Sequence, residues 1–434
     1  MDTSYGMVVK LMKEKALKYH RLPTPGKIAI QPTKPCRTQQ DLSLAYTPGV
    51  AWPCIEIAER PEAAYDYTGR GNLVAVISDG TAVLGLGDIG PLAGKPVMEG
   101  KALLFKRFAG IDAIDLEVAE KDVDRFVDIV AALEPSFGGV NLEDIASPRC
   151  FAIEENLKAR MKIPVFHDDQ HGTAVIAAAA ILNGLDIVGK DIRDVRVAMS
   201  GSGAAGVAIA RHLVELGMTP EQIFACGRSG VLYEGRANRV SPWHDILFRK
   251  TSARTLADIM QGADIFIGVS AAGLVDEAML RSMAKDPIIL PMANPDPEVP
   301  YEVIMRVRPD ALAGTGRSDY PNQVNNVLGF PAIFRGALDV RASAITDGMK
   351  VAASRALARI ARLPVPEAVL KAYGLKELSF GRDYLIPKPF DLRVLVEEAC
   401  AVAEAAVAEG VSRVADFDAA AYRRSLEERF LTEG

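Results

Sequence analysis

The chain has 434 residues, of which 49% are hydrophobic and 24% are charged, and its formal net charge at pH 7 is −6. This length predicts two or three domains that can each bury a core, and the acidic balance argues against nucleic-acid binding, which requires a basic face. The longest apolar run, residues 174–182, is far shorter than the roughly 18 residues of a membrane span. The first 22 residues lack the apolar stretch of a secretory signal, and five scattered cysteines without a C-x-x-C pair are typical of reduced thiols. We therefore expect a cytoplasmic protein that binds neither membranes nor nucleic acids.

The first 40 residues predict a short amphipathic helix followed by an extended, proline-punctuated arm. Between about residues 72 and 166, apolar strand-like runs alternate with helical segments; residues 73–78 and 163–166 are the clearest strands. Residues 120–133 predict an amphipathic helix, because apolar side chains recur there at the i, i+3, i+4, i+7 spacing. These side chains are Val123, Phe126, Val127 and Val130.

Residues 167–325 alternate more regularly. The runs VRVAMS, IFAC, ADIFIGVS and PIILPMAN predict strands, and helical stretches such as VAIARHLVELG separate them. This rhythm predicts βαβ units and a parallel sheet with both faces covered, and the chain after residue 325 is alanine-rich and helical. The predicted fold class is therefore α/β, with a Rossmann-type doubly wound parallel sheet. We expect this domain, residues 167–325, to be inserted between residues 1–166 and a helical part, residues 326–434, that returns to the first domain.

Two glycine loops match the dinucleotide pattern G-x-G-x-x-G, one from Gly85 to Gly90 and one from Gly201 to Gly206. A working fingerprint needs a strand before it and a helix whose N-terminus faces the pyrophosphate. We predict that no helix follows the first loop, because Pro91, Gly94 and Pro96 come after it. We expect this loop to be a tight backbone bend; the functional alternative is that it lines the active-site cleft. The second loop lies between a predicted strand and a predicted helix. We assign the pyrophosphate site to Gly201, Ser202, Gly203, Ala204, Ala205 and Gly206.

The next strand predicts which dinucleotide is bound. In NAD-binding domains a carboxylate roughly twenty residues after the glycines binds the ribose 2′-hydroxyl, but here the strand ends in Gly227, Arg228 and Ser229. Arg228 offers a charge-assisted fork for a 2′-phosphate and Ser229 a hydroxyl donor. NADP is favoured; the alternative is that Arg228 is only a solvated turn residue.

Four carboxylates follow two of the predicted strands: Glu143, Asp144, Asp168 and Asp169. Neighbouring parallel strands end at the same edge of a sheet, where ligands bind, and acidic groups gathered there need a cation or a lysine to neutralise them. Hard oxygen ligands suit Mg²⁺ or Mn²⁺. His167 and His171 have no cysteine or third histidine to complete a zinc site, so we expect them to support the site or cap a helix. For any single aspartate, Asp169 in particular, the alternative is a helix N-cap.

Seven motifs in chain order carry a family resemblance: YTPGV, SDGTAVLGLGDIGPLAGKPVMEGK, NLEDI, FHDDQHGTA, GSGAAG, ANPDPE and NQVNNVLGFPAIFRGALD. Over nearly its whole length the chain resembles the malic enzymes, in particular the short bacterial NADP-linked type. The resemblance implies divalent-metal-dependent oxidative decarboxylation of a small-molecule substrate, malate, to pyruvate and CO₂ with reduction of NADP. It also implies a homodimer in which the N-terminal arm can reach the partner subunit.

The resemblance further implies roles for individual residues. By position, Tyr46 is expected to be the general acid and Lys101 the general base, with Asp168 beside the lysine. A base at this position requires a pKa well below the usual value of about 10.4; burial beside a cation would lower it, and Asp168 would raise it. The expected metal ligands are Glu143, Asp144 and Asp169, and the expected ligands of the substrate carboxylate or of the nicotinamide end are Asn294, Asn325 and Asn326. Whether Tyr46 serves its own subunit or the partner stays open.

Two positions depart from the family pattern. Ala82 stands where larger relatives carry an arginine that holds a substrate carboxylate, and Gly227 stands where many short relatives carry an aspartate, which favours NADP. The chain ends at residue 434, before the phosphotransacetylase-like extension of some bacterial relatives, so we expect no acetyl-CoA regulation through it.

Other functions fit the sequence less well. An oxaloacetate decarboxylase without net redox could use the same cation and lysine, but the complete glycine fingerprint favours redox chemistry. A non-catalytic nucleotide sensor would not need the carboxylates, the lysine and the tyrosine that this chain retains. Amino-acid dehydrogenases share a two-domain plan but do not require the acidic cluster.

Overall fold

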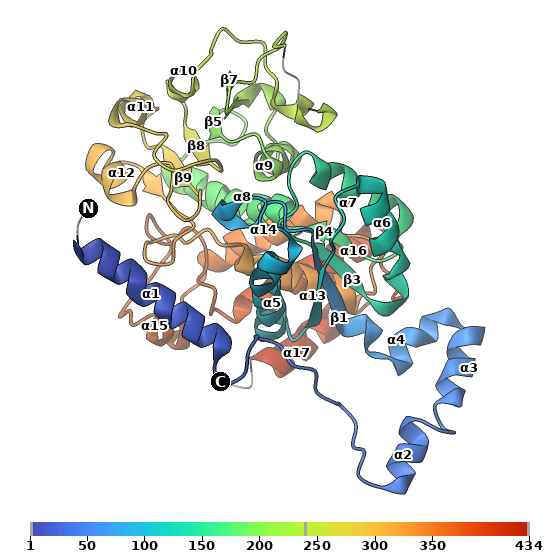
Figure 1. The fold of residues 1–434 in the computed structure, drawn as a ribbon. Helices are drawn as coiled ribbons and strands as arrows, with labels where there is room; N and C mark the ends of the chain where they lie inside the picture. The colour runs from blue at the N-terminus through green and yellow to red at the C-terminus, as the bar shows by residue number, and fades with distance from the viewer. Residues whose placement is uncertain (1–2, 238–240, 432–434) are drawn as a thin grey trace.

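The computed structural model of the protein describes residues 3–237 and 241–431, which form two β-sheets surrounded by helices (Figure 1). The first sheet has the strand order β2-β1-β3-β4 and the second the order β10-β9-β8-β5-β6-β7. The strands of the first sheet are β1 (Leu73–Ser78), β2 (Asp112–Glu117), β3 (Gly139–Leu142) and β4 (Val165–His167). Those of the second are β5 (Val197–Ser200), β6 (Ile223–Gly227), β7 (Gly230–Val231), β8 (Ile265–Gly268), β9 (Ile288–Pro291) and β10 (Leu312–Ala313). The predicted α/β fold class is confirmed.

The helices before the second sheet are α1 (Thr3–Arg21), α2 (Gln39–Ala45), α3 (Ala51–Glu59), α4 (Ala64–Tyr67), α5 (Pro91–Ala109), α6 (Val123–Ala132), α7 (Arg149–Arg160) and α8 (Asp168–Val188). Within and after that sheet come α9 (Ala204–Glu215), α10 (Leu256–Met260), α11 (Glu277–Ser282), α12 (Tyr301–Val307), α13 (Phe330–Asp339), α14 (Asp347–Ala361), α15 (Glu367–Ala372), α16 (Arg393–Ala408) and α17 (Ala419–Phe430). Short 3₁₀ helices, among them η3 (Leu84–Leu86), η6 (Pro242–Leu247) and η7 (Asn326–Leu328), connect them.

The first sheet is parallel throughout and is buried by helices from both ends of the chain. Helix α5 packs on β1 and β2, and α13 returns to the same layer and packs against α5. Phe105 of α5 and Phe334 of α13 meet edge to face, 5.1 Å between ring centroids. A side chain on Gly139 of β3 would come 3.1 Å from the Phe334 ring, so a glycine there lets the C-terminal helices close on the sheet. The predicted strand at residues 73–78 and the predicted helix around Phe126 are confirmed.

The prediction that no helix follows the first glycine loop is wrong. Helix α5 begins at Pro91, with Gly90 as its N-cap, and continues through Pro96. Proline is favoured at the first helical position because an N–H there has no acceptor within the helix, so its absence costs nothing. The fixed φ of proline also matches the helical value. Pro96 has no N–H and so costs the helix one hydrogen bond, to the carbonyl of Leu92. The apolar face that α5 buries outweighs this local cost.

The second sheet has the order expected of a dinucleotide-binding domain. Counted from β5, its strands lie in the order 6-5-4-1-2-3, with β5 at the point where the order reverses. One edge departs from the predicted parallel pattern, because β7 pairs antiparallel to β6 through a tight turn between Gly227 and Gly230. All other pairs in the sheet are parallel, as predicted.

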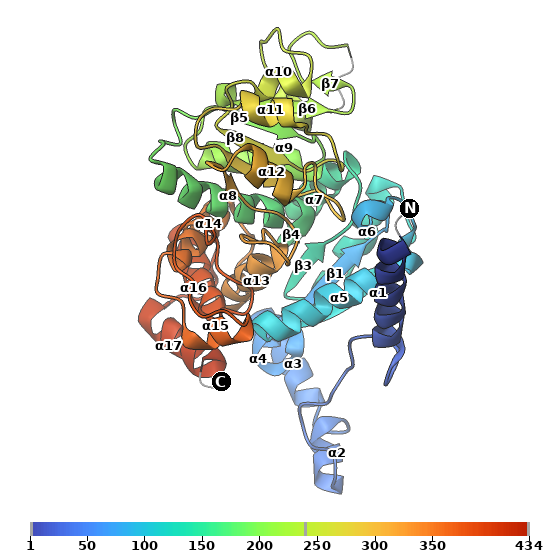
Figure 2. The same cartoon turned by 90° about the vertical axis from the view of Figure 1, so that its left-hand side faces the viewer.

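Helix α8 connects the two sheets and lies in the interior. It is long and apolar enough to cross a membrane by length and composition, the one such helix in the described part of the chain, but 67% of that stretch is buried within the protein. Helices α9 and α14 pack against it, so α8 is a core helix of the protein (Figure 2).

The N-terminal arm extends away from the body of the protein (Figures 1 and 2). Helices α2 and α3 contain no buried residue, although they carry large apolar side chains. Leu44 of α2 is 68% exposed and Trp52 of α3 71%, and Ile30, in the segment before α2, is 91% exposed. The arm therefore presents an apolar surface without covering it within its own subunit.

Candidate active site

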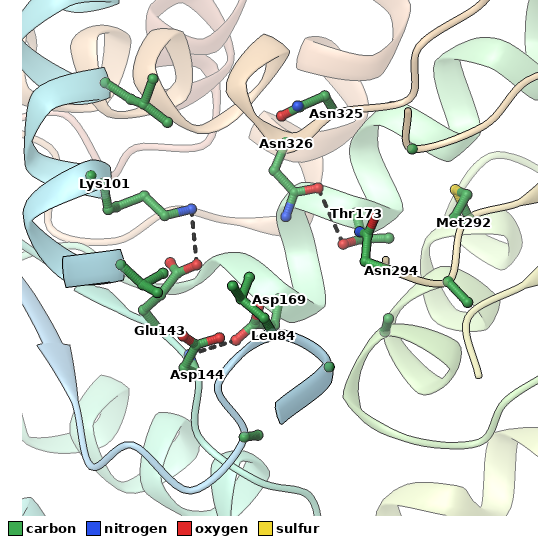
Figure 3. Close-up of a pocket in the computed structure, with 18 of the residues that line it drawn as sticks. Leu84, Lys101, Glu143, Asp144, Asp169, Thr173, Met292, Asn294, Asn325 and Asn326 are labelled. Atoms are coloured by element: carbon green, nitrogen blue, oxygen red, sulfur yellow. Dashed lines mark hydrogen bonds and ion pairs between the residues drawn. The ribbon is translucent and has the colours of Figure 1, made fainter. Parts of the chain in front are cut away.

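A cavity of about 700 Å³ lies where the carboxyl ends of both sheets face each other. From the first sheet it is lined by residues that follow β3 and β4, and from the second by residues that follow β8 and β9. Figure 3 shows side chains from both groups pointing toward a common space. Because the carboxyl ends of parallel strands are where open α/β sheets bind ligands, this cavity is the strongest candidate for an active site.

Three carboxylates meet at one side of this cavity. One oxygen each of Glu143, Asp144 and Asp169 lies within 4.8 Å of the others. The backbone N–H of Asp144 donates to Asp169 Oδ2 at 2.8 Å, and the left-handed backbone of Asp144, φ 54°, turns the chain after β3 so that consecutive acids stay together. Asp169 follows β4 in the first turn of α8, whose N-cap is His167, so Asp169 is not the cap itself.

The cluster is electrostatically unfavourable as it stands. Burial and the neighbouring charge of Asp169 raise the pKa of Asp144 to about 7, and burial raises the pKa of Glu143 well above its ordinary value. Asp144 Oδ2 is buried and has no hydrogen-bond partner among the described residues. Three hard oxygen donors with one oxygen unpaired form a set that a divalent cation would satisfy.

Lys101 points from α5 toward the same cluster. Its ammonium lies 2.6 Å from Asp168 Oδ2 and 2.9 Å from Glu143 Oε1, and 4.2 Å from the centroid of the Phe330 ring. Burial alone would lower the pKa of Lys101, but the charges of Asp168 and Glu143 more than offset it, so the pKa lies above its ordinary value. In this arrangement Lys101 is protonated and paired.

The three predicted asparagines all line the cavity but are engaged differently. Asn326 Nδ2 donates to Asp168 Oδ2 at 3.0 Å, and Asn326 Oδ1 accepts from Thr173 Oγ1 at 3.3 Å. Its amide therefore orients the partner of Lys101. The Asn325 side chain accepts from the Val327 N–H at 3.0 Å, which leaves its amide donors available to a ligand, and Asn294 follows β9 at the junction with the second sheet.

The structure does not bring Tyr46 to the cavity of its own subunit. Tyr46 is the C-cap of α2 on the projecting arm, and it is 70% exposed. The tyrosine that does line the cavity is Tyr19, near the end of α1. Ala82 also lines the cavity and offers it no charge.

The histidines lie behind the carboxylates and outside the group of three. His167 is fully buried, with Nε2 3.1 Å from Asp169 Oδ2. His171 Nε2 lies 2.7 Å from Glu154 Oε1, on the side away from the cavity.

A second cavity, of about 920 Å³, lies along the second glycine loop. Its lining includes Gly201, Ser202 and Gly203, and it shares Val269 and Ser270 with the first cavity. A side chain on Gly201, φ 116°, would come 2.5 Å from the Val269 carbonyl, and one on Gly206 would come 2.4 Å from the Gly201 carbonyl. Nothing lies within 4 Å of a side chain placed on Gly203, the N-cap of α9, so a ligand can approach the backbone there.

The wall of this second cavity is basic. Arg228 lines it from the turn after β6, and Arg254 lines it from the segment before α10; none of its described lining residues is acidic. Arg254 stacks on Tyr233, 3.7 Å from the ring centroid, which holds its guanidinium in place. Ser229, Ala204 and Gly206 line neither cavity, and Ala205 lines the first.

Sequence reasoning missed several lining residues. Arg254 has one signal in the sequence, the capping box that begins α10 at Thr255 and fixes the preceding residue at a strand-to-helix turn. Lys27 and Tyr19 had none, because they reach the cavity from a segment outside both sheets. Of the first glycine loop, Gly85 lines the first cavity, whereas Gly87 and Gly90 line neither.

Comparisons with known proteins agree with this architecture. The family described as malic enzyme, N-terminal domain, matches residues 25–121 and 114–158, and the malic enzyme NAD binding domain matches residues 170–370. An NADP-dependent malic enzyme of Salmonella typhimurium is 58% identical over 94% of this chain, which spans only 54% of that protein. An NADP-dependent malic enzyme of Halomonas elongata is 54% identical over 92% of this chain and 95% of its own length.

A solved structure is similar over the same extent. The malic enzyme of Pyrococcus horikoshii superposes with a TM-score of 0.87 at 44% identity, covering 96% of this chain and 95% of that one. These findings agree with one another. The two domain families match in the expected order, the relatives share more than half of their aligned residues with this chain, and the fold is the same over nearly the full length. The chain belongs to the malic enzyme family.

Proposed function

We propose that this protein catalyses the oxidative decarboxylation of malate to pyruvate and CO₂ with NADP as the oxidant and Mg²⁺ or Mn²⁺ as a required ion. The observation that carries the proposal is the convergence of Glu143, Asp144 and Asp169 beside Lys101, at the point where this cavity joins the one along the glycine loop. An acidic metal site next to a paired lysine and a dinucleotide loop is what a metal-assisted hydroxy-acid oxidation requires.

We propose that Glu143, Asp144 and Asp169 hold the metal. Their hard oxygens, and the unpaired Asp144 Oδ2 in particular, fit a divalent cation of the Mg²⁺ or Mn²⁺ type. When bound, such an ion supplies positive charge that polarises the C2 oxygen of malate and favours loss of the adjacent carboxylate.

Lys101 is the proposed proton acceptor for the C2 hydroxyl. Its ammonium is held by Asp168 and Glu143, and Asn326 fixes Asp168 from the other side. If Glu143 is engaged by a cation, one of the two charges that raise the pKa of Lys101 is withdrawn, which moves the lysine toward its base form. Thus Asp168 and Asn326 orient the lysine, while Asn294 and Asn325 remain available to bind the substrate.

The second cavity is proposed to hold NADP. Gly201, Gly203 and the N-terminus of α9 would receive the pyrophosphate, and Arg228 the 2′-phosphate. The absence of an acidic side chain among the described lining residues supports NADP over NAD. On this basis residues 167–325 form the cofactor domain, and the segments before and after it form the substrate domain.

Tyr46 is proposed to complete the site of a partner subunit. The arm that carries it has exposed apolar side chains that none of the described residues covers, and a second copy of the protein is the occupant that a symmetric dimer would supply. There Tyr46 would protonate C3 after CO₂ leaves. We place this dimer in the cytoplasm, where the five unpaired cysteines stay reduced.

A steady-state assay of the purified protein tests the proposal. Malate should be oxidised only when a divalent ion is present, with one NADPH and one pyruvate formed per malate, and NAD should be the poorer oxidant. Chelation should abolish the reaction. If oxaloacetate is decarboxylated while malate is not oxidised with either nucleotide, the redox assignment is wrong and the decarboxylase alternative holds.

A further inference from the structure

Only two cationic side chains occur among the described residues that line the first cavity, Lys27 and Lys101. The ammonium of Lys101 is already paired with two carboxylates. That of Lys27 takes part in none of the ion pairs among the described residues and donates instead to the backbone carbonyl of Pro96, 2.5 Å away. Lys27 is therefore the one cation among the described lining residues that forms no ion pair with a carboxylate.

The position of Lys27 is fixed by the protein. The chain turns at Gly26, φ 89°, and the Lys27 backbone N–H donates to Glu99 Oε2 at 3.0 Å. A side chain placed on Gly100 would lie 3.8 Å from Lys27 Nζ. The ammonium thus sits over α5, next to the residue that precedes Lys101.

The balance of charges in the cavity favours the binding of a negatively charged group at this ammonium. The cavity and its immediate neighbourhood contain four carboxylates, of which a divalent cation and Lys101 together would balance three charges. A dicarboxylate substrate adds two more negative charges, and one of its carboxylates is not needed at the metal. Burial lowers the pKa of Lys27, and the charges of Glu99 and Asp115 only partly offset this, so a bound anion would stabilise its charged form.

We propose that Lys27 binds the second carboxylate of the substrate and so makes the site selective for dicarboxylic over monocarboxylic 2-hydroxy acids. The proposal rests on the function proposed above, and it assigns to the segment after α1 a direct role in substrate recognition. A purely structural role, in which Lys27 only ties this segment to α5 through Pro96, is the competing explanation.

Two ligands separate these explanations. Malate and (S)-lactate share the 2-hydroxycarboxylate that would reach the metal and differ by the second carboxylate. Both can be bound without turnover to the full-length protein with Mn²⁺ and NADPH, and their dissociation constants measured by calorimetry or by NADPH fluorescence. The variants are Lys27→Met and Lys27→Arg, with Lys18→Met as a matched control, because Lys18 is exposed on α1 and does not line the cavity.

Lys27→Met should weaken malate binding about 10- to 100-fold, as expected for loss of a charge-assisted hydrogen bond, and leave lactate binding unchanged. Lys27→Arg should keep most of the preference for malate, and Lys18→Met should resemble the wild type. Equal weakening of both ligands, or unchanged malate binding, would overturn the proposal. Turnover of malate by the wild type tests the proposed function separately, so an active wild type with a normal Lys27→Met variant refutes only the role of Lys27.

Discussion

Tyr46 and Lys101 lie in different parts of one subunit, and the proposal that they meet across a dimer interface can be tested by pairing two impaired variants. Tyr46→Phe removes the acidic hydroxyl and Lys101→Ala removes the base, so each homodimer should lose most of its kcat. In a mixed dimer, one site receives both altered residues and the other receives neither. Random pairing of equal amounts gives about half mixed dimers, so the mixture should recover about one quarter of the wild-type activity.

The assay is co-expression of the two variants with different affinity tags, followed by tandem purification of the mixed dimer. The purified mixed dimer should show about half of the wild-type kcat per subunit pair. Tyr19→Phe is the matched control, because Tyr19 lines the cavity from its own subunit and its loss should leave turnover largely intact. A mixed dimer that is no more active than its parents would refute a site shared between subunits. So would loss of turnover in Tyr19→Phe but not in Tyr46→Phe.

Three further predictions concern single residues. Asp144→Asn should weaken Mn²⁺ binding at least about tenfold and remove the rise in melting temperature that Mn²⁺ gives the wild type; an unchanged rise would exclude Asp144 from the metal site. Arg228→Ala should raise KM for NADP about 10- to 100-fold and spare NAD; equal losses for both nucleotides would refute a 2′-phosphate contact. Neither carboxyl oxygen of Glu398 has a hydrogen-bond partner among the described residues, and burial raises the pKa of Glu398 well above its ordinary value. The wild type therefore loses stability as pH rises from the ordinary carboxylate pKa toward this raised one. Glu398→Gln should therefore stabilise the protein in urea unfolding at about pH 7 and make little difference near pH 4; the same effect at both pH values would contradict this.

Much of the acidic cluster could be predicted from the sequence because parallel strands impose a direction. Residues that follow β3 and β4 must appear at the same edge of the sheet, so Glu143, Asp144 and Asp169 were expected to meet, and they do. The second glycine loop could be recognised for a similar reason, since strand, glycines and helix are continuous in the chain. For the acidic cluster and for the second glycine loop, the order of strands, helices and motifs along the chain was enough to predict the arrangement.

Features that depend on other parts of the molecule were not predictable in this way. The continuation of α5 through Pro96 follows from the apolar face that the helix buries against β1 and β2, which outweighs a local helix breaker. The antiparallel strand β7 follows a two-residue turn, and the sequence of this turn does not distinguish a hairpin from an irregular loop. Arg254 and Lys27 reach their cavities from segments distant in sequence. Tyr46 lies on the projecting arm, away from the cavity of its own subunit, and no local pattern in the sequence indicates that position.

The two cavities are connected by residues that one buried carboxylate holds in place. Glu298 Oε1 accepts from the N–H and the hydroxyl of Ser270, at 2.8 and 3.2 Å, and Oε2 accepts from the Ala293 N–H at 3.2 Å. Its carboxyl group fills the space where a side chain on Gly268 would lie, 2.4 Å from the nearest atom. Glu298 therefore joins the end of β8, where Val269 and Ser270 line both cavities, to the end of β9, where Ala293 lines the first cavity. A shift at the end of β8 would move the lining of both cavities together, so we expect the position of a nucleotide in the proposed cofactor site to affect that of a substrate in the proposed substrate site.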